Sequence, residues 1–554
     1  MVGELIRLKL TLRRRSPSGA ATLALVLLVG GTTLTWYFMW AAPEADVRGQ
    51  LWSLATALWA AGWILGPTLA NGIGALRPQY FTLFPLDRRR VGAALLATAF
   101  VGTGPALTLV AVGSLGLHAW RTEPASLPVA LVGAVVLWVL LLSLSRLVFR
   151  ALGAAMRTRL GMELASVQWG VFLAVLFFGW MAVQPAISAM ATLPRTGSGT
   201  GPVTDVLAAL PTGWPVLAVE AAADGAWGVS LAWLAALAAV TAAVVLVTAV
   251  LSAPSTAPRS MRRRSRPLGS RVLAPGRLPL LPDTPLGAVV GKELRQWWRD
   301  PWRGLEVRAA MWAALFMGSL AWSVEGYAFL APFTGLIMAL VMTLATANLY
   351  AMDGTALWMT VVGQGPATAR ADVRGRQLAV LALMVPVASV LSALFVVGTG
   401  EHWAWPAVIT GMVTLFGVGS GLSILLSVVM LTPGVDPHLR VDANDSGDNQ
   451  LQVWAALLGT PLLSAPAVGA TVWVYLAGMP WWSVPFGVVN GIAVAWILGR
   501  LAHRRLENRL AETFTHMRYG REVALQALPE RGSWLDALQR GALNTNEETR
   551  AKGS

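Results

Sequence analysis

Long apolar stretches recur throughout this chain of 554 residues, and they constrain its fold more than any other feature. A helix that crosses a lipid bilayer needs about 20 consecutive, mostly apolar residues. Twelve stretches approach this requirement, so we expect an all-α polytopic membrane protein with twelve transmembrane helices. They lie near residues 20–40, 51–72, 91–117, 127–148, 164–188, 227–251, 306–323, 328–350, 378–398, 405–431, 453–476 and 483–502.

The composition supports a membrane protein. Only 13% of the residues are charged and 55% are hydrophobic, whereas soluble domains carry about 25% charged residues. The first apolar stretch follows a basic leader, but it is longer than the h-region of a signal peptide, so we expect a retained helix. The chain has no cysteine, which excludes disulfides, thiolate metal sites and cysteine nucleophiles.

The positive charges are distributed unevenly between the expected loops. If the N-terminus is cytoplasmic, the only basic residues in outside loops are Arg48, Arg121 and Arg195. Cytoplasmic loops of membrane proteins carry this excess of Lys and Arg. The pattern predicts a multi-pass protein of the plasma membrane with both termini cytoplasmic. It also explains the net charge of +14 without a nucleic-acid partner.

The chain reads as two related halves. "VGELIRLKLTLRRR" opens the first at Val2, and "VGKELRQWWRDPWR" opens the second at Val290. Each of these amphipathic segments precedes six apolar stretches, so we expect two six-helix halves related as a parallel repeat. The predicted domains are a first half (1–251), a Pro/Arg-rich cytoplasmic linker (252–286), a second half (287–502) and a cytoplasmic tail (503–554).

The segment that opens the second half predicts an interfacial helix. On a helix, one face would hold Val290, Leu294, Trp297 and Trp298. The Asp300-Pro301 pair should end it, because the residue before proline is driven out of the α region. Such a helix would lie in the membrane interface, with the disordered basic loop as the alternative. In the N-terminal segment the apolar residues alternate, which fits a strand equally well, but its position before a span favours a helix.

The chain lacks the residues that several kinds of functional site require. A phosphate-binding loop would need Gly at 286 and Ser or Thr at 293, where the chain has Leu286 and Glu293, so we expect no ATP-binding site and no enzyme activity. The five histidines are not spaced as metal ligands. The carboxylates Glu163, Glu325 and Asp353 fall at the ends of the expected spans, and no ion site is evident. Glycines four residues apart, Gly417/Gly421 and Gly487/Gly491, predict close helix packing.

Four segments, in this order, resemble the permease subunit of ABC-2 type ABC exporters, of the fused two-half actinobacterial kind. "LFPLDRRRVGAALL" from Leu83 resembles the family's cytoplasmic loop after the second span, and "LPTGWPVLAVEAAADG" from Leu210 its outside segment before the sixth span. "GKELRQWWRDP" from Gly291 resembles its leading interfacial helix. "NLYAMDGTALWMTVVGQGPATARADVRGRQLAV" from Asn348 resembles the same cytoplasmic loop in the second half.

The resemblance implies an ATP-driven exporter whose ATPase lies in other chains. Two copies of a cytoplasmic ABC ATPase subunit, holding ATP and Mg, would drive alternating access in this chain, which itself needs no cofactor. The residues implied in coupling are Phe84, Pro85, Leu86, Asp87, Arg88 and Arg89 in the first half, and Gly365, Pro366, Ala367, Thr368 and Arg370 in the second. The interfacial helices would add Glu4, Arg7, Glu293, Arg295, Trp297 and Trp298.

The substrate would be hydrophobic or amphipathic, such as a drug, an antibiotic or a lipid, which is the setting of multidrug efflux. Trp52, Trp59 and Trp63 recur at near-helical spacing on the second span and are candidates for the substrate path, but a lipid-facing role explains them equally well. Two other functions stay open. An ion-coupled secondary transporter would need a buried acid, and a membrane transferase could use Asp442, Asp445 and Asp448.

Overall fold

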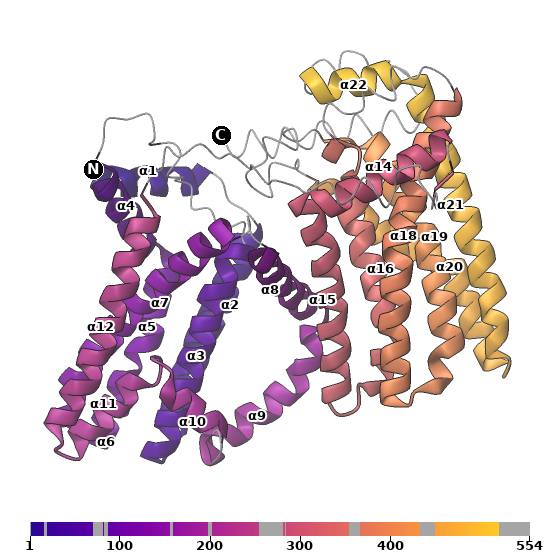
Figure 1. Ribbon diagram of the computed structural model, residues 1–554. Coiled ribbons are helices and arrows are strands. Elements are labelled where there is room, and N and C mark those ends of the chain that lie inside the picture. The colour runs from indigo at the N-terminus through magenta and orange to yellow at the C-terminus, as the bar shows by residue number, and fades with distance from the viewer. Residues whose placement is uncertain are drawn as a thin grey trace. The chain divides into compact units, whose positions relative to one another are not determined.

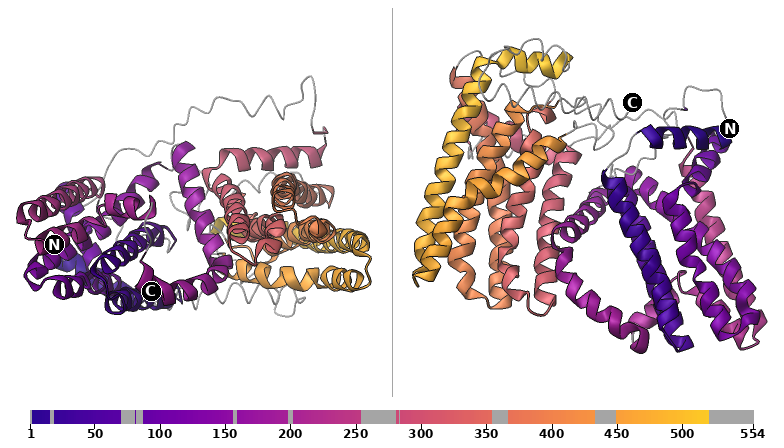
Figure 2. Two further views of the ribbon diagram at one scale, coloured as in Figure 1. Left: turned by 90° about the horizontal axis from the view of Figure 1, so that it is seen from below. Right: turned by 180° about the vertical axis from the view of Figure 1, so that it is seen from behind.

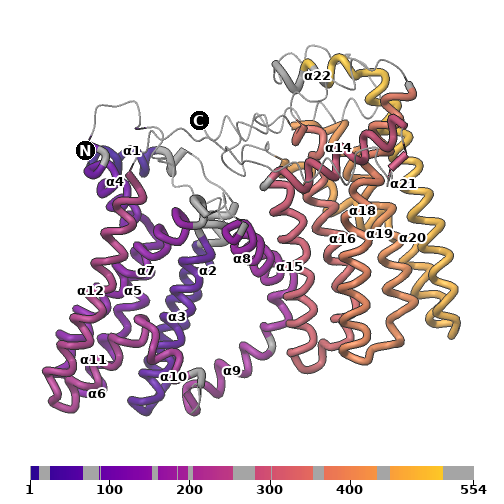
Figure 3. The backbone as a smooth tube through the Cα atoms, in the orientation of Figure 1, coloured from indigo at the N-terminus to yellow at the C-terminus, as the bar shows by residue number. Residues whose placement is uncertain are grey.

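In the computed structural model of the protein, the described residues are mostly helical (Figure 1). The described residues are 2–15, 19–69, 81, 87–155, 159–197, 202–253, 281–282, 284–353, 366–432 and 449–519 (coloured in Figure 3). No strand occurs within these ranges, which confirms the all-α prediction for them. The predicted linker, the Asp442–Asp448 segment and the tail beyond residue 519 lie outside the described residues almost entirely.

The helices form two compact units, each with its own apolar core. The first unit contains α1 (Val2–Arg15), α2 (Gly19–Ala41), α3 (Ala45–Leu69), α4 (Arg88–Ala97), α5 (Thr103–Gly113), α6 (Leu115–Thr122), α7 (Leu127–Ala155), α9 (Val183–Thr196), α10 (Pro202–Ala209), α11 (Trp214–Ala223) and α12 (Trp227–Leu251). The second contains α8 (Arg159–Phe178), α14 (Pro285–Arg299), α15 (Pro301–Ser323), α16 (Thr334–Ala345), α18 (Pro366–Thr399), α19 (Trp405–Val429), α20 (Gln450–Leu476), α21 (Ser483–Asn508) and α22 (Leu510–Tyr519).

Eight helices of the described chain are long and apolar enough to cross a membrane. They coincide with eight of the twelve predicted spans, and a ninth span corresponds to a bent pair of helices. The other three stretches are also helical, in α2, α3 and α15, but they are not among these eight. The structure therefore supports a membrane-embedded helical protein, while twelve spans and the repeat of two halves stay predictions.

The span predicted over residues 91–117 is not one continuous helix. Its two parts, Arg89–Phe100 and Thr103–Thr122, meet at an angle of 66°. Gly102 lies between them with φ 144°, a backbone conformation that glycine adopts far more readily than other residues. The Lys9 ammonium of α1 donates to the carbonyl oxygens of Thr98 and Val101 at this break, at 2.6 and 2.9 Å.

Close packing of α19 and α21 confirms the prediction made from the glycine pairs. A Cβ added to Gly417 would lie 2.1 Å from the carbonyl oxygen of Gly491, and one added to Gly491 would lie 2.5 Å from that of Val413. Only residues without a side chain allow the two backbones to come this close. These helices form part of the core of the second unit, together with α16 and α18.

Helix α8 precedes the predicted linker but packs within the second unit. Gly170 lies against α15 so closely that an added Cβ would be 2.3 Å from Cβ of Trp312. Glu163 on α8 also forms an ion pair with Arg308 on α15, at 3.0 Å. A division of the chain at residue 251 therefore does not describe the packing of α8.

Candidate functional site

The helix that opens the second half forms as the sequence predicts. The hydroxyl of Thr284 accepts a hydrogen bond from the Gly287 amide, and Pro285 occupies the first turn of α14, where its missing N–H costs nothing. The helix ends at Asp300, whose carboxylate accepts from the Trp302 amide at 3.0 Å and so caps α15. Helix α14 lies across one end of α15, α16 and α18 (Figures 1 and 2).

The buried face of α14 differs from the predicted one. Val290, Glu293 and Trp297 are buried, whereas Trp298 is 85% exposed. The apolar pattern put Trp297 and Trp298 on one face of the helix, but only Trp297 is buried, and the buried side also includes Glu293, which lies outside that apolar face. The reason is that Glu293 is neutralised by arginines from other helices, which periodicity along one helix does not reveal.

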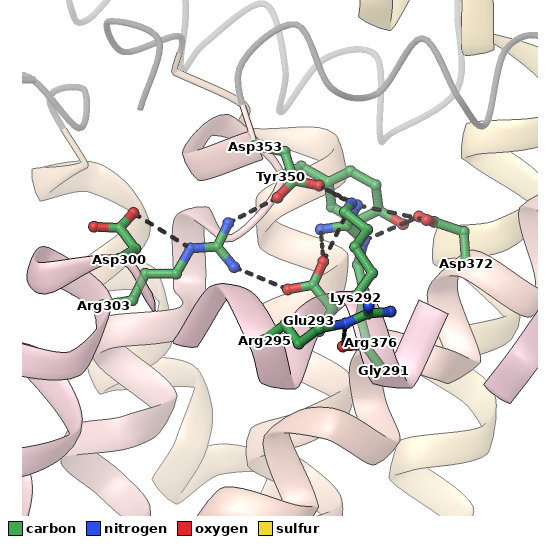
Figure 4. A network of polar contacts seen from close by, with 10 residues as sticks. All are labelled: Gly291, Lys292, Glu293, Arg295, Asp300, Arg303, Tyr350, Asp353, Asp372 and Arg376. Atoms are coloured by element: carbon green, nitrogen blue, oxygen red, sulfur yellow. Dashed lines mark hydrogen bonds and ion pairs between the residues drawn. The ribbon is translucent and has the colours of Figure 1, made fainter. Parts of the chain in front are cut away.

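A network of charged side chains surrounds Glu293 (Figure 4). Arg303 of α15 donates through Nη1 to Glu293 Oε2 at 2.9 Å and through Nη2 to Asp353 Oδ1 at 2.7 Å. The Lys292 ammonium donates to Asp353 Oδ2 at 2.5 Å. Arg303 thereby joins α14 to the segment that follows α16.

Arg376 of α18 forms the second centre of this network. Its guanidinium pairs with Glu293 Oε1 at 2.9 Å, Asp353 Oδ2 at 2.5 Å and Asp372 Oδ2 at 3.0 Å. It also lies over the Tyr350 ring, 4.1 Å from the centroid. The Tyr350 hydroxyl donates to Asp372 at 2.5 Å. Arg376 thus pairs with three carboxylates, which lie on α14, on the segment after α16 and on α18 itself.

Three cations of this network face three buried carboxylates, and a fourth, partly exposed carboxylate, Asp300, lies 4.0 Å from Arg303 Nε. The cations are Lys292, Arg303 and Arg376, and the buried carboxylates are Glu293, Asp353 and Asp372. Burial would raise the pKa of Asp353, but Arg376, Lys292 and Arg303 outweigh this and hold the pKa well below its ordinary value. Removing one partner from such a cluster leaves an uncompensated buried charge, which typically costs about 3–5 kcal/mol. The network is therefore a stiff connection, and each of its carboxylates is neutralised by a neighbouring cation.

The network lies at both ends of the predicted second coupling loop. The described chain stops at Asp353 and resumes at Pro366, where α18 begins, so Gly365 lies outside the described residues. Ala367 and Arg370, on the first turn of α18, are exposed, and Thr368 is partly exposed. Asp353 precedes this loop directly, and Asp372 and Arg376 follow it.

The first coupling loop lies partly outside the described residues, which begin again at Asp87 after Phe84, Pro85 and Leu86. Asp87 caps α4 by accepting from the Arg89 amide at 3.0 Å, and Arg88 is the first residue of the helix. The Arg89 side chain is exposed. Asp87 and Arg88 therefore lie at the start of α4, just as the second predicted coupling loop ends at the start of α18.

The N-terminal segment is a helix, α1, as its position before a span predicts. Leu5 is buried against Val91, Ala94 and Leu95 of α4, whereas Glu4 and Arg7 are exposed. The two helices that were predicted to be interfacial therefore differ, because the buried acid of α14 has no counterpart at Glu4. Arg295 of α14 is half-buried, and its Nε donates to the Gly291 carbonyl at 2.9 Å.

The candidate path tryptophans anchor α3 inside the first unit. Trp52 is fully buried in its core. The indole N–H of Trp59 donates to Thr35 of α2 at 3.1 Å, and that of Trp63 donates to Thr108 of α5 at 3.0 Å. A lipid-facing role does not fit Trp52, and the indole groups serve the packing of α3 against its neighbours.

Sequence reasoning missed most of the network. Asp353 was expected at the end of a span, and Arg303, Tyr350, Asp372 and Arg376 were not singled out. One signal was present, since Asp372 and Arg376 are four residues apart and share one helix face. Within the described residues, no group of three or more His, Asp or Glu side chains could hold a metal ion.

No protein-family model, curated protein or solved structure matches the chain. The function must therefore be argued from the sequence motifs and the geometry of these sites.

Proposed function

We propose that this chain is the membrane-spanning permease of an ATP-driven exporter, resembling the ABC-2 type. Two copies of a cytoplasmic ATPase subunit, which hold ATP and Mg, would bind its interfacial helices and coupling loops. The substrate would be a small hydrophobic or amphipathic molecule that moves outward across the lipid bilayer. The chain itself would hydrolyse no ATP.

The observation that carries this proposal is the position of the buried network. A permease that is driven by a separate ATPase subunit must transmit movement from the elements that bind this subunit to its membrane spans. The connection between them therefore has to be rigid. Glu293 and Asp353 are each held by arginines of α15 and α18, so α14 and the start of the second loop are fixed to two long helices. A force applied at Arg370 or along α14 would therefore move these helices together.

The same network gives little support to an ion-coupled transporter. Such a transporter keeps a buried carboxylate available to a proton or a sodium ion. Here Glu293, Asp353 and Asp372 are each paired with at least one arginine. We therefore favour an external energy source for movement of the second unit.

The test is purification of the tagged chain from native membranes in mild detergent. We expect a co-purifying ATP-binding subunit at about two copies per chain, with ATP hydrolysis. Replacing residues 85–89 by a Gly/Ser linker should release that subunit. Glu325→Gln, which changes an exposed carboxylate in the connector after α15, should retain it. Absence of any ATP-binding subunit from a folded chain would contradict the proposal.

A further inference from the structure

Three helices of the first unit bring an acid and a histidine together over a glycine. Gly49 lies on α3, His118 on α6 and Glu220 on α11, and these helices contact one another. A Cβ added to Gly49 would lie 2.8 Å from Glu220 Oε1 and 3.8 Å from His118 Cε1. The absence of a side chain at residue 49 leaves the room into which both groups point.

The histidine is buried without a hydrogen-bond partner among the described residues. His118 is 0% exposed, and neither Nδ1 nor Nε2 makes a hydrogen bond there. An unpaired polar group in a protein interior is costly, and each exception needs an explanation. Cε1 lies between the two ring nitrogens, and it and Glu220 Oε1 are both side-chain atoms close to the position of a Cβ on Gly49.

Arg48, the basic residue next to Gly49 in the sequence, makes its hydrogen bonds to groups other than Glu220 and His118. Arg48 is buried, and its guanidinium donates to the carbonyl oxygens of Ala42 and Pro43 and to the Thr122 hydroxyl, at 3.3, 2.6 and 3.3 Å. Burial of His118 and, to a smaller extent, the positive charge of Arg48 lower the pKa of the imidazole to about 4. The imidazole is thereby favoured as a neutral proton acceptor.

The charged groups around Glu220 oppose its ionisation. Half-burial, together with the carboxylates of Asp46 on α3 and Asp224 after α11, raises the pKa of Glu220 to about 7. The elements packed against α11 carry the titratable or charged groups Asp46, Arg48, His118, Arg121, Glu123 and Asp205. The half of α7 near α11 and the whole of α12 carry none.

From this geometry we propose that Glu220 and His118 form a proton-binding site in the first unit. The site holds one proton, carried by the Glu220 carboxyl and available to a ring nitrogen of His118. Loss of this proton places a third carboxylate beside Asp46 and Asp224 and loosens α11 from α3. The site lies at the end of the unit opposite α1 (Figure 1), which the predicted topology places outside the cell. The external pH would then control how tightly α11 packs.

This site does not depend on the exporter function, because it can be measured on the isolated chain. The measurement is pH-dependent infrared difference spectroscopy of the purified full chain in detergent. As the pH rises, the C=O absorption band of the protonated Glu220 carboxyl should disappear from the wild-type spectrum, with a midpoint at about pH 7. Glu220→Gln should abolish that band, and Glu44→Gln, which removes an exposed carboxylate just before α3, should leave it unchanged.

Two further variants keep the proposal open to refutation if Glu220→Gln does not fold. Gly49→Ala would place a methyl group 2.8 Å from both Glu220 Oε1 and Val216 Cγ1, and it should shift the midpoint by displacing the carboxyl. His118→Asn should also shift it. A neutral-pH band that persists in Glu220→Gln, or a midpoint unchanged in both Gly49→Ala and His118→Asn, would overturn the proposal.

Discussion

Glu293 on α14 and Arg376 on α18 lie 2.9 Å apart, between Oε1 and Nη1, and both side chains are 0% exposed. Glu293 lies on the helix that precedes α15, and Arg376 lies on the helix that follows the predicted second coupling loop. Because of this contact, the charged segment in α14 is part of the packed helix bundle of the second unit.

Arg376→Ala should destabilise the second unit by about 3–5 kcal/mol, because it leaves Glu293 and Asp372 buried without this arginine. The matched control is Arg370→Ala, an exposed arginine on the same helix, which should change stability little. Thermal unfolding of the purified chain measures the difference. Equal midpoints for the two variants would show that the network contributes nothing.

Asp353→Asn should destabilise the chain at neutral pH and progressively less in acid. The pKa of Asp353 is depressed in the folded protein, so the ionised carboxylate stabilises the fold above its unfolded pKa of about 3.9. That stabilisation is lost progressively as the pH falls from this value toward the much lower pKa of the folded state. The difference in stability between wild type and variant should therefore begin to shrink below about pH 4, and a difference that grows in acid would contradict the assigned ion pairs.

Gly417→Ala should separate α19 from α21. Its methyl group would meet the Gly491 carbonyl oxygen at 2.1 Å, and overpacking of this kind typically costs about 1–3 kcal/mol. Gly469→Ala on α20, where an added Cβ meets nothing within 4 Å, is the control. If both substitutions lower the unfolding temperature equally, the close contact is not what requires glycine.

Lys9→Met should weaken the contact between α1 and the broken helix. The variant leaves the carbonyl oxygens of Thr98 and Val101 without the lysine donor, at a cost of about 1–3 kcal/mol. Hydrogen exchange of the α4 amides should then be faster than in Arg7→Ala, which changes an exposed residue of the same helix. Identical exchange in both variants would exclude a role for Lys9 at the break.

The apolar pattern was sufficient to predict the helices and several of their ends. It placed the end of α14 at Asp300 and the close packing at Gly417 and Gly491 correctly, because these features depend on local backbone sterics. It did not predict the bend at Gly102, since an apolar run gives no sign of a break.

The buried network could not be read from one helix at a time. Glu293 is stable in the interior only because Arg303 and Arg376 arrive from other helices, and this pairing is set by the tertiary fold. The pair formed by Glu220 and His118 was hidden for the same reason, as Gly49, which makes room for it, lies on a third helix. The packing of α8 against α15 likewise follows from complementary surfaces, which the order of the spans does not determine.

The most direct test of the link between α14 and α18 is a distance measured by spin labels. The chain has no cysteine, so Trp298→Cys on α14 and Leu378→Cys on α18, both at exposed positions, can be labelled without background. In the proposed complex with an ATPase subunit, the distance distribution should be narrow and the same with and without trapped ATP. Adding Arg376→Gln should broaden it, whereas Arg370→Gln should not. A wild-type distance that changes on ATP binding would contradict the claim that the network moves these helices as one body.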